Sequence, residues 1–284
     1  PGVFNVVTTG PRNTPEVGEE LCHNKLVKHL SFTGSTPVGK YLNTECARTI
    51  KHVSLELGGN APFIVFEDAD LKDAAKGLLS SKFRSSGQTC VCANRVLVQR
   101  SIVDAYVEAV KEAIDSTFVY GSVWDKKVNF GPLYCGKGIS KVRQHLKDAE
   151  SKGAMLAYGG EAKERGPNFF LPSIVKDTNK DMQFMLDETF RPLACIVAFD
   201  TEEEAIALAN DTDFGLAGYF YTENISRLWR VAEALNVGMV GARVGLVSAA
   251  EMPFGGVKES GLGREGGIEA LNGFLNTKSI TIGV

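Results

Sequence analysis

A cysteine on a glycine-preceded turn is the first residue of this sequence that could do chemistry. Cys90 ends the run Gly87–Cys90, and Arg84 comes shortly before it. A cysteine presented on a loop beside a cation is favoured as a thiolate, which attacks electrophilic carbon. The alternative is a small core side chain, which is what most single cysteines are. A nucleophilic role for Cys90 also requires a base.

A glutamate between two leucines could supply that base. Glu56 is flanked by Leu55 and Leu57 and is followed by Gly58 and Gly59. Apolar surroundings destabilise an ionised carboxylate, which moves its proton affinity toward that of a working general base. The two glycines predict that backbone or a ligand approaches closely here. The alternative is a solvated glutamate at a strand end.

A third segment, Gly34–Tyr41, matches a phosphate-binding P-loop up to its last position, where the motif needs Ser or Thr to hold Mg²⁺. Tyr41 is too long and too weak an oxygen ligand for that role, and Pro37 removes an amide that would bind phosphate. These departures argue against a nucleotide triphosphatase. What remains is a small-residue turn at a helix N-terminus, which suits a phosphate. The alternative is an ordinary helix start capped by Ser35.

Strand-like runs alternate with amphipathic windows around these segments, which predicts an α/β protein with parallel strands. Residues 27–32, a helix from the Gly34-Ser35 turn to about Arg48, and residues 52–56 form a predicted βαβ unit. Its strand ends should point at a ligand, because open α/β sheets bind at their carboxyl edge. Further strands are predicted at residues 62–66, 96–98, 155–156, 194–197 and 279–282, and further helices at residues 71–83, 103–114, 137–151, 202–210 and 225–235. The last strand is apolar, so we expect it to pair with another segment.

The amino-acid composition limits which classes of molecule this chain is expected to bind. The 284 residues are 44% hydrophobic and 23% charged with a net charge of −3, as in a globular protein of one or two domains. Apolar runs are far shorter than the roughly 20 residues of a membrane helix, and no signal segment opens the chain. The 31 basic and 34 acidic residues form no long charge run, which argues against nucleic acid and anionic lipid. We therefore expect a small-molecule site in an intracellular protein, cytoplasmic or mitochondrial.

The six cysteines fit a reducing compartment. Cys90 and Cys92 are separated by one residue, where a zinc site usually has two to four, and no second ligand pair follows, so we expect no metal. The chain begins at Pro1, which is consistent with removal of an initiator methionine or with a fragment of a longer chain.

Taken together, these motifs resemble the aldehyde dehydrogenase superfamily. In the family's order the sequence contains Phe32–Ser35, Glu56–Gly59, Gly87–Cys90, Asp187–Phe190, and Pro253–Gly256 with Lys258 to Gly261. The resemblance covers essentially the whole chain. Ser81–Arg84, Met239–Gly241 and Gly245–Ser248 are most similar to the succinate-semialdehyde dehydrogenases.

The resemblance implies a role for each matching residue. Cys90 would attack an aldehyde, and Glu56 would activate the water that hydrolyses the resulting thioester. NAD or NADP is the implied cofactor, with contacts from Gly34, Ser35, Leu57, Glu188 and Phe190. The substrate's distal carboxylate would be held by Arg84 and Ser248, near Phe254. Some members form a redox disulfide between the positions of Cys90 and Cys92.

The resemblance also implies a division of the chain. Residues 1–57 would be the C-terminal part of the cofactor-binding domain, 58–250 the catalytic domain, 251–275 a return segment, and 276–284 an oligomerisation strand that makes a homo-oligomer.

Three departures from the family pattern bear on function. The family chain has a large segment before the position of Pro1, including an oxyanion-hole asparagine whose loss alone costs roughly 10²–10³ in rate. Arg191 stands where the family has glycine, and Arg243 replaces an asparagine. Two guanidinium groups could clash with the cofactor or substitute for it.

Three hypotheses follow. The first is a truncated NAD(P)-dependent semialdehyde dehydrogenase that needs its missing half in trans or in a longer chain. The second is a short paralogue that uses Cys90 and Glu56 without cofactor, for hydrolysis, isomerisation or cyclisation. The third is an inactive scaffold that binds a full-length relative through the strand at residues 279–282.

Overall fold

The computed structural model describes residues 2–122 and 124–283, and its elements divide between two units. The small unit consists of Pro1–Leu57, Ala249–Gly255 and Gly261–Val284, and the large unit consists of Gly58–Ser248 and Gly256–Ser260. The first boundary lies between Leu57 and Gly58, and Gly256–Ser260 of the large unit stand between two segments of the small unit. The domain division that the family resemblance implies stays a prediction.

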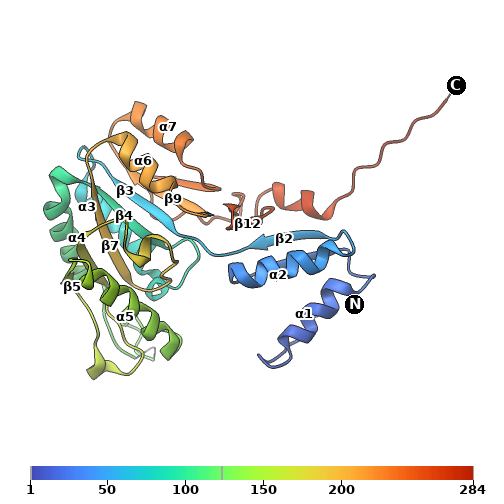
Figure 1. Cartoon of the computed structure of the whole chain (residues 1–284), viewed down its shortest axis with the longest axis horizontal. Helices are drawn as coiled ribbons and strands as arrows, with labels where there is room; N and C mark the ends of the chain where they lie inside the picture. Colours follow the sequence, from blue (N-terminus) through green and yellow to red (C-terminus); the bar gives the residue numbers. More distant parts are fainter. Residues whose placement is uncertain (1, 123, 284) are drawn as a thin grey trace. The chain divides into compact units, whose positions relative to one another are not determined.

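The small unit is built on the predicted βαβ unit, which the structure confirms. Its elements are α1 (Thr14–His23), β1 (His29–Thr33), α2 (Thr36–Ala47), β2 (His52–Glu56), β12 (Gly261–Leu262) and the 3-10 turn Glu269–Phe274. Strand β1 pairs in parallel with β2, and β12 pairs antiparallel with the other edge of β2. Figure 1 shows α2 running along β2. A small core of Cys22, Leu30, Leu42 and Cys46 holds α1 and α2 to this sheet.

Within the described residues, the large unit contains a seven-stranded sheet in the order β10-β9-β3-β4-β7-β6-β5. Its strands are β3 (Ala61–Val65), β4 (Ala93–Gln99), β5 (Met155–Tyr158), β6 (Ser173–Thr178), β7 (Leu193–Phe199), β9 (Ala217–Tyr221) and β10 (Met239–Ala242), and β8 (Phe214–Gly215) pairs separately with β11 (Val257–Lys258). All neighbours in the large sheet are parallel except β5 and β6. The central strands are buried almost throughout, as expected for parallel strands covered on both faces.

Three of the five α-helices that the structure describes in the large unit, α3, α6 and α7, begin at a capping side chain. The five helices are α3 (Leu71–Leu78), α4 (Val103–Thr117), α5 (Gly136–Ser151), α6 (Glu202–Asn210) and α7 (Ile225–Ala234), with short 3-10 or π-helical turns at Leu79–Phe83, Arg84–Gly87, Arg100–Ile102, Lys163–Arg165 and Gln183–Met185. Asp70 accepts hydrogen bonds from two amides of α3, and Asn224 does the same for α7. Figure 1 shows α6 beside α7, and Glu202 of α6 forms ion pairs with two arginines of α7.

Several predicted elements need correction. The predicted helix at 71–83 changes at Leu79 into a π-helical turn. Strands β6, β9 and β10 were not predicted; Gly218 in β9 and Gly241 in β10 weaken the strand pattern. Residues 279–282 pair with no strand of the described chain, and Ile280 and Ile282 are exposed, because a strand forms only against a partner edge. Val284, at the end of the predicted oligomerisation strand, lies outside the described residues.

The sequence also predicts that apolar runs are too short for a membrane-spanning helix, and the length of the observed helices bears on this. None of the helices within residues 2–122 and 124–283 is long and apolar enough to span a membrane.

Candidate functional site

The segment before Cys90 has an unusual backbone. Ser85 and Ser86 adopt φ values of 51° and 55°, and Gly87 follows at 73°. Two consecutive non-glycine residues in the left-handed region are strained, so the surrounding structure must impose this turn. Ser86 Oγ donates a hydrogen bond to the Gly131 carbonyl at 2.8 Å. The turn therefore fixes the start of the cysteine loop.

Cys90 lies in the turn that follows and is partly exposed. The Cys92 amide donates to the Thr89 carbonyl at 3.1 Å, which closes the turn. Gly59 lies directly against it, since a Cβ at that position would come 2.5 Å from the Cys90 carbonyl oxygen. The predicted close approach is thus confirmed at Gly59. Because its side chain is on a loop rather than in the core, Cys90 does not fit the alternative of a buried packing residue.

Lys82 is buried behind this loop and was not recognised as a site residue from the sequence. Its side chain is fully buried, and its Nζ donates to Asn94 Oδ1 at 3.0 Å. The buried Cys92 thiol donates to the Lys82 carbonyl at 3.4 Å. Burial raises the pKa of Cys92, and the charge of Lys82 opposes that rise. A lysine inside the apolar stripe of Leu78, Leu79 and Phe83 is the signal that could have identified it.

Glu188 is held beside Gly59. The Gly59 amide donates to Glu188 Oε1 at 3.0 Å, so Gly59 contacts both the cysteine loop and this carboxylate. Burial raises the pKa of Glu188, while the hydrogen bond from Gly59 and the charge of Lys82 act in the opposite direction. Phe190, two residues on, has a positive φ of 53°. The structure therefore brings together Cys90 and Glu188, two of the predicted site residues, through Gly59.

Arg191 packs half-buried beside these residues. Its Nη1 donates to the Phe190 carbonyl, and its guanidinium lies against α5 at Gly138, where a Cβ would come 2.6 Å from Nε. Nε is buried and has no hydrogen-bond partner. Burial lowers the pKa of Arg191, and Cys135 and Glu188 oppose that shift. The substitution for glycine therefore places an incompletely hydrogen-bonded cation near Glu188.

Arg243 has separate partners. It forms an ion pair with Glu223 at 2.9 Å, and both line a polar cavity of about 840 Å³ at the start of α3. Its φ of 56° is a conformation that asparagine tolerates better than arginine. The two substituted arginines therefore do not share a binding surface through any contact among the described residues.

The predicted substrate residues of the large unit are exposed. The Arg84 side chain makes no hydrogen bond or ion pair within the described residues, and its charge opposes the rise that burial causes in the pKa of Tyr219. Ser248 ends a loop that passes tightly over α3, since a Cβ at Gly245 would come 2.0 Å from the Gly77 carbonyl oxygen. The structure leaves both side chains accessible to a ligand.

In the small unit, Glu56 ends β2 and is only 3% exposed. Neither carboxylate oxygen has a hydrogen-bond partner. The carboxyl lies against Gly255, where a Cβ would come 2.6 Å from Oε1. Burial, followed by repulsion from Glu265, raises the pKa of Glu56 to about 8, while Arg264 acts in the opposite direction. The alternative of a solvated glutamate is therefore wrong, because the carboxyl is buried.

The turn before α2 adjoins an apolar cavity. Ser35 occupies the N-cap position, but its side chain makes no capping hydrogen bond. Leu57 packs on α2 at Gly39, where a Cβ would come 2.4 Å from its Cδ2, and the Phe32 ring lies against Gly34. A cavity of about 720 Å³ lies among α1, β1 and α2, and is lined mainly by Pro11, Val17, Leu21, Leu30, Phe32, Val38 and Leu42. A cavity of this size with a mainly apolar lining suits an organic ligand.

Phe254 also belongs to the small unit. It exchanges backbone hydrogen bonds with Glu265 at 2.6 and 2.7 Å, which fixes the segment that follows β12. Its side chain is partly exposed.

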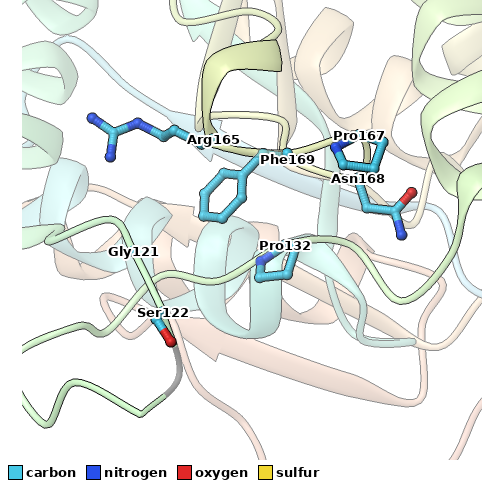
Figure 2. Close-up of a pocket in the computed structure, with 8 residues that line it drawn as sticks. Gly121, Ser122, Pro132, Arg165, Pro167, Asn168 and Phe169 are labelled. Carbon is cyan, nitrogen blue, oxygen red and sulfur yellow. The ribbon is translucent and has the colours of Figure 1, made fainter.

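A further cavity lies in the large unit (Figure 2). It encloses about 550 Å³ and is lined by Gly121, Ser122, Pro132, Arg165, Gly166, Pro167, Asn168 and Phe169. Figure 2 shows the Phe169 ring above Pro132, with Arg165 extending to one side. None of the predicted site residues lines this cavity. Across residues 2–122 and 124–283, no group of three or more His, Cys, Asp or Glu side chains is arranged to hold a metal ion.

Comparison with known proteins gives these sites a context. Residues 1–280 match the aldehyde dehydrogenase family. Human mitochondrial succinate-semialdehyde dehydrogenase is 49% identical over 282 residues, which are 99% of this chain and 53% of the human one. The NADP(+) succinate-semialdehyde dehydrogenase of Escherichia coli K12 is 50% identical over 283 residues, covering 100% and 58% of the two chains.

Comparison with solved structures also finds an aldehyde dehydrogenase among the similar proteins. An NADP-dependent enzyme of E. coli superposes with a TM-score of 0.96 at 50% identity, covering 100% of this chain and 58% of that one. An aldehyde dehydrogenase from Brucella melitensis gives 0.93 at 53% identity, with coverages of 98% and 56%. The chain spans about half the length of the curated relatives that it matches.

Proposed function

The chain belongs to the aldehyde dehydrogenase family, and on this premise we propose that it acts in the thiol-based oxidation of a semialdehyde, such as succinate semialdehyde, to its acid with NAD(P). The observation that carries the proposal is the Glu56 carboxyl, which is buried without a hydrogen bond and has a pKa of about 8. A carboxyl in that state is costly to the fold, and groups with such perturbed pKa values are concentrated at functional sites.

Cys90 is the nucleophile in this reaction. Its Sγ bonds to the aldehyde carbon, and the carbonyl oxygen takes up the electron pair. Loss of hydride from that carbon leaves a thioester on Cys90. Glu56 in its ionised form then removes a proton from water, the water oxygen bonds to the thioester carbon, and Cys90 leaves as a thiolate. With a pKa of about 8, roughly a tenth of the Glu56 carboxyls are ionised near pH 7.

Features of the small unit support NAD(P) as the cofactor. The apolar cavity among α1, β1 and α2 suits a purine, and the N-terminal turn of α2 beside Gly34 and Ser35 suits a phosphate. Leu57 packs beneath that turn, and the family resemblance assigns Glu188 to the nicotinamide ribose and Phe190 to packing beside it. A nicotinamide held by these residues would supply the acceptor for the hydride.

The substrate's second carboxylate would be recognised by Arg84 and Ser248, and the family resemblance adds Phe254 as a substrate residue. Arg84 supports this assignment because its guanidinium is exposed and has no anionic partner among the described residues. A planar guanidinium binds a carboxylate through two parallel hydrogen bonds. Cys90 and Cys92 lie in one turn, which supports a protective disulfide between them.

Turnover measurements test the dehydrogenase proposal. The chain is mixed with succinate semialdehyde and NAD⁺ or NADP⁺, and reduced nicotinamide is followed by absorbance. A second arm adds, as a separate polypeptide, the part of the E. coli relative that this chain does not match. We expect reduced nicotinamide with the wild-type chain in at least one arm and none with Cys90→Ser. Glu56→Gln should retain a single turnover and accumulate the acyl group on Cys90, as seen by mass spectrometry. No reduced nicotinamide and no acyl group in either arm would refute the proposal.

Arg191 favours a second candidate, thioester hydrolysis without cofactor. Its half-buried guanidinium lies near Glu188, the residue assigned to the cofactor ribose, and its Nε has no partner. Hydrolysis of an acyl thioester in the absence of nucleotide, lost in Cys90→Ser, supports this function. Binding of NAD⁺ or NADP⁺ at micromolar concentration, measured by calorimetry, counts against it.

The C-terminal segment supports assembly with another chain, as a homo-oligomer or with a full-length relative. Residues 276–283 belong to no helix or strand, and Ile280 and Ile282 expose 76% and 84% of their surface. Deletion of residues 276–284 should shift the chain to a smaller species in sedimentation. An unchanged sedimentation profile would argue against this role.

A further inference from the structure

Two thiols meet in the small core of the small unit. Cys22 lies in the last turn of α1 and Cys46 near the end of α2, and both side chains are fully buried. Their sulfur atoms are 3.6 Å apart. This is van der Waals contact, and a disulfide bond of about 2.05 Å requires a further approach of only about 1.5 Å. Within the described chain, Cys22 and Cys46 thus form a pair at bonding reach.

We propose that Cys22 and Cys46 form a reversible disulfide that locks α1 to α2. The bond would join helices that are otherwise held by few contacts. In α1, Cys22 is the one residue that is fully buried, while Val17 and Leu21 are more than a third exposed. The core shared with α2 contains only four buried side chains. Elements with so few buried contacts open locally at low cost.

Local opening explains how buried thiols can react. Burial and the neighbouring Cys46 raise the pKa of Cys22 to about 11, so the closed state resists oxidation. When α1 opens, one thiolate attacks a hydroperoxide to give a sulfenic acid and one water or alcohol. The second thiolate attacks that sulfur and releases water. Overall, two thiols and one hydroperoxide give one disulfide, one water and one further water or alcohol.

The disulfide would act on the apolar cavity. Val17 and Leu21 of α1 and Val38 and Leu42 of α2 are among the residues that line it. A covalent bond near the C-terminal ends of both helices fixes their separation, so oxidation would hold the cavity at one width. Reduction would restore the freedom of α1. The small unit thereby carries a redox-sensitive modification site distinct from the cysteine loop at Cys90.

Peptide mapping of the native wild-type chain tests the proposal. The chain is treated with hydrogen peroxide, alkylated and digested with trypsin. Cys22 lies in the peptide 13–25, Cys46 in 41–48, and Cys90 and Cys92 together in 85–95, so each disulfide has its own signature. We expect peptides 13–25 and 41–48 to be linked and to lose the mass of two hydrogen atoms. A link that appears only in urea-unfolded chain, or no link at all, would overturn the proposal.

Cysteine variants and the hydrogen-exchange rates of backbone amides supply the controls. Cys22→Ser should abolish the link, and Cys195→Ser, which changes another buried thiol, should preserve it. If Cys22→Ser does not fold, Cys46→Ala replaces it. In the wild-type chain, oxidation should slow hydrogen exchange of α1 amides by at least about tenfold, and a reductant should reverse this. Unchanged exchange in fully linked protein would overturn the locking role. These readouts do not depend on dehydrogenase activity.

Discussion

Glu56→Gln should stabilise the small unit increasingly as pH rises from about 5 to 8. The pKa of Glu56 is about 8 in the folded chain, against an ordinary value of 4.5. Between these values the folded state retains a proton that the unfolded state has released, so the free energy of unfolding falls as pH rises. The fall is about 1.4 kcal/mol per pH unit, which amounts to about 3 kcal/mol at pH 7. Glutamine has the same shape and no such cost.

Urea unfolding of both proteins, followed by circular dichroism, measures the difference. Near pH 5 the two should differ by less than about 1 kcal/mol, and near pH 7 the variant should be more stable by up to about 3 kcal/mol. Above pH 8 the difference should stop growing, because the folded wild type has then lost its proton too.

A neighbouring carboxylate gives a matched control. Glu265 raises the pKa of Glu56 by repulsion, so Glu265→Gln should move the pH dependence of the wild type toward lower pH. Arg264→Gln should move it the other way. A stability difference between the wild type and the Glu56→Gln variant that stays constant across pH would show an ionised carboxylate in the folded state, and the argument from burial to general base would fail.

Three further substitutions probe the large unit. Gly59→Ala places a methyl group 2.5 Å from the Cys90 carbonyl oxygen and should lower stability by roughly 1–3 kcal/mol in denaturant titration, with loss of any Cys90-dependent activity. Arg243→Asn places a residue that tolerates positive φ at this position and should raise stability by up to about 1 kcal/mol; a drop of that size in thermal melting would contradict the strain. Lys82→Met removes the charge that lowers the pKa of Cys92, so iodoacetamide should alkylate Cys92 more slowly, and an equal rate would exclude this influence.

Local sequence signals predicted much of the fold. Helices α6 and α7 were predicted almost to the residue, because Thr201 and Asn224 mark their starts with capping side chains. Strand β2 was predicted from 52 to 56 as observed. Strand β9 was missed, because a glycine and a tyrosine-rich run do not alternate, and its place between β3 and β10 depends on partners far along the chain.

The candidate site, like the fold, could be predicted from the sequence only in part. The residue context predicted Cys90 and Glu56 as site residues, and the family resemblance added Glu188. The sequence did not predict that Gly59 joins the Cys90 loop to Glu188, that Lys82 is fully buried, or that Arg191 and Arg243 have different partners. It also gave no sign of the cavity among α1, β1 and α2.

The sequence by itself determined the family, the α/β architecture and the residue types available for chemistry, because these depend on local pattern and on motif order. Only the tertiary structure decided the burial, the pKa and the contacts of each group. Glu56 has a pKa of about 8 because distant segments, including Gly255 and Glu265, surround it and exclude water. Cys22 and Cys46 are in contact because the crossover through β1 returns α2 against α1. Burial and proximity arise from segments that are far apart in sequence, and so they cannot be read from either segment alone.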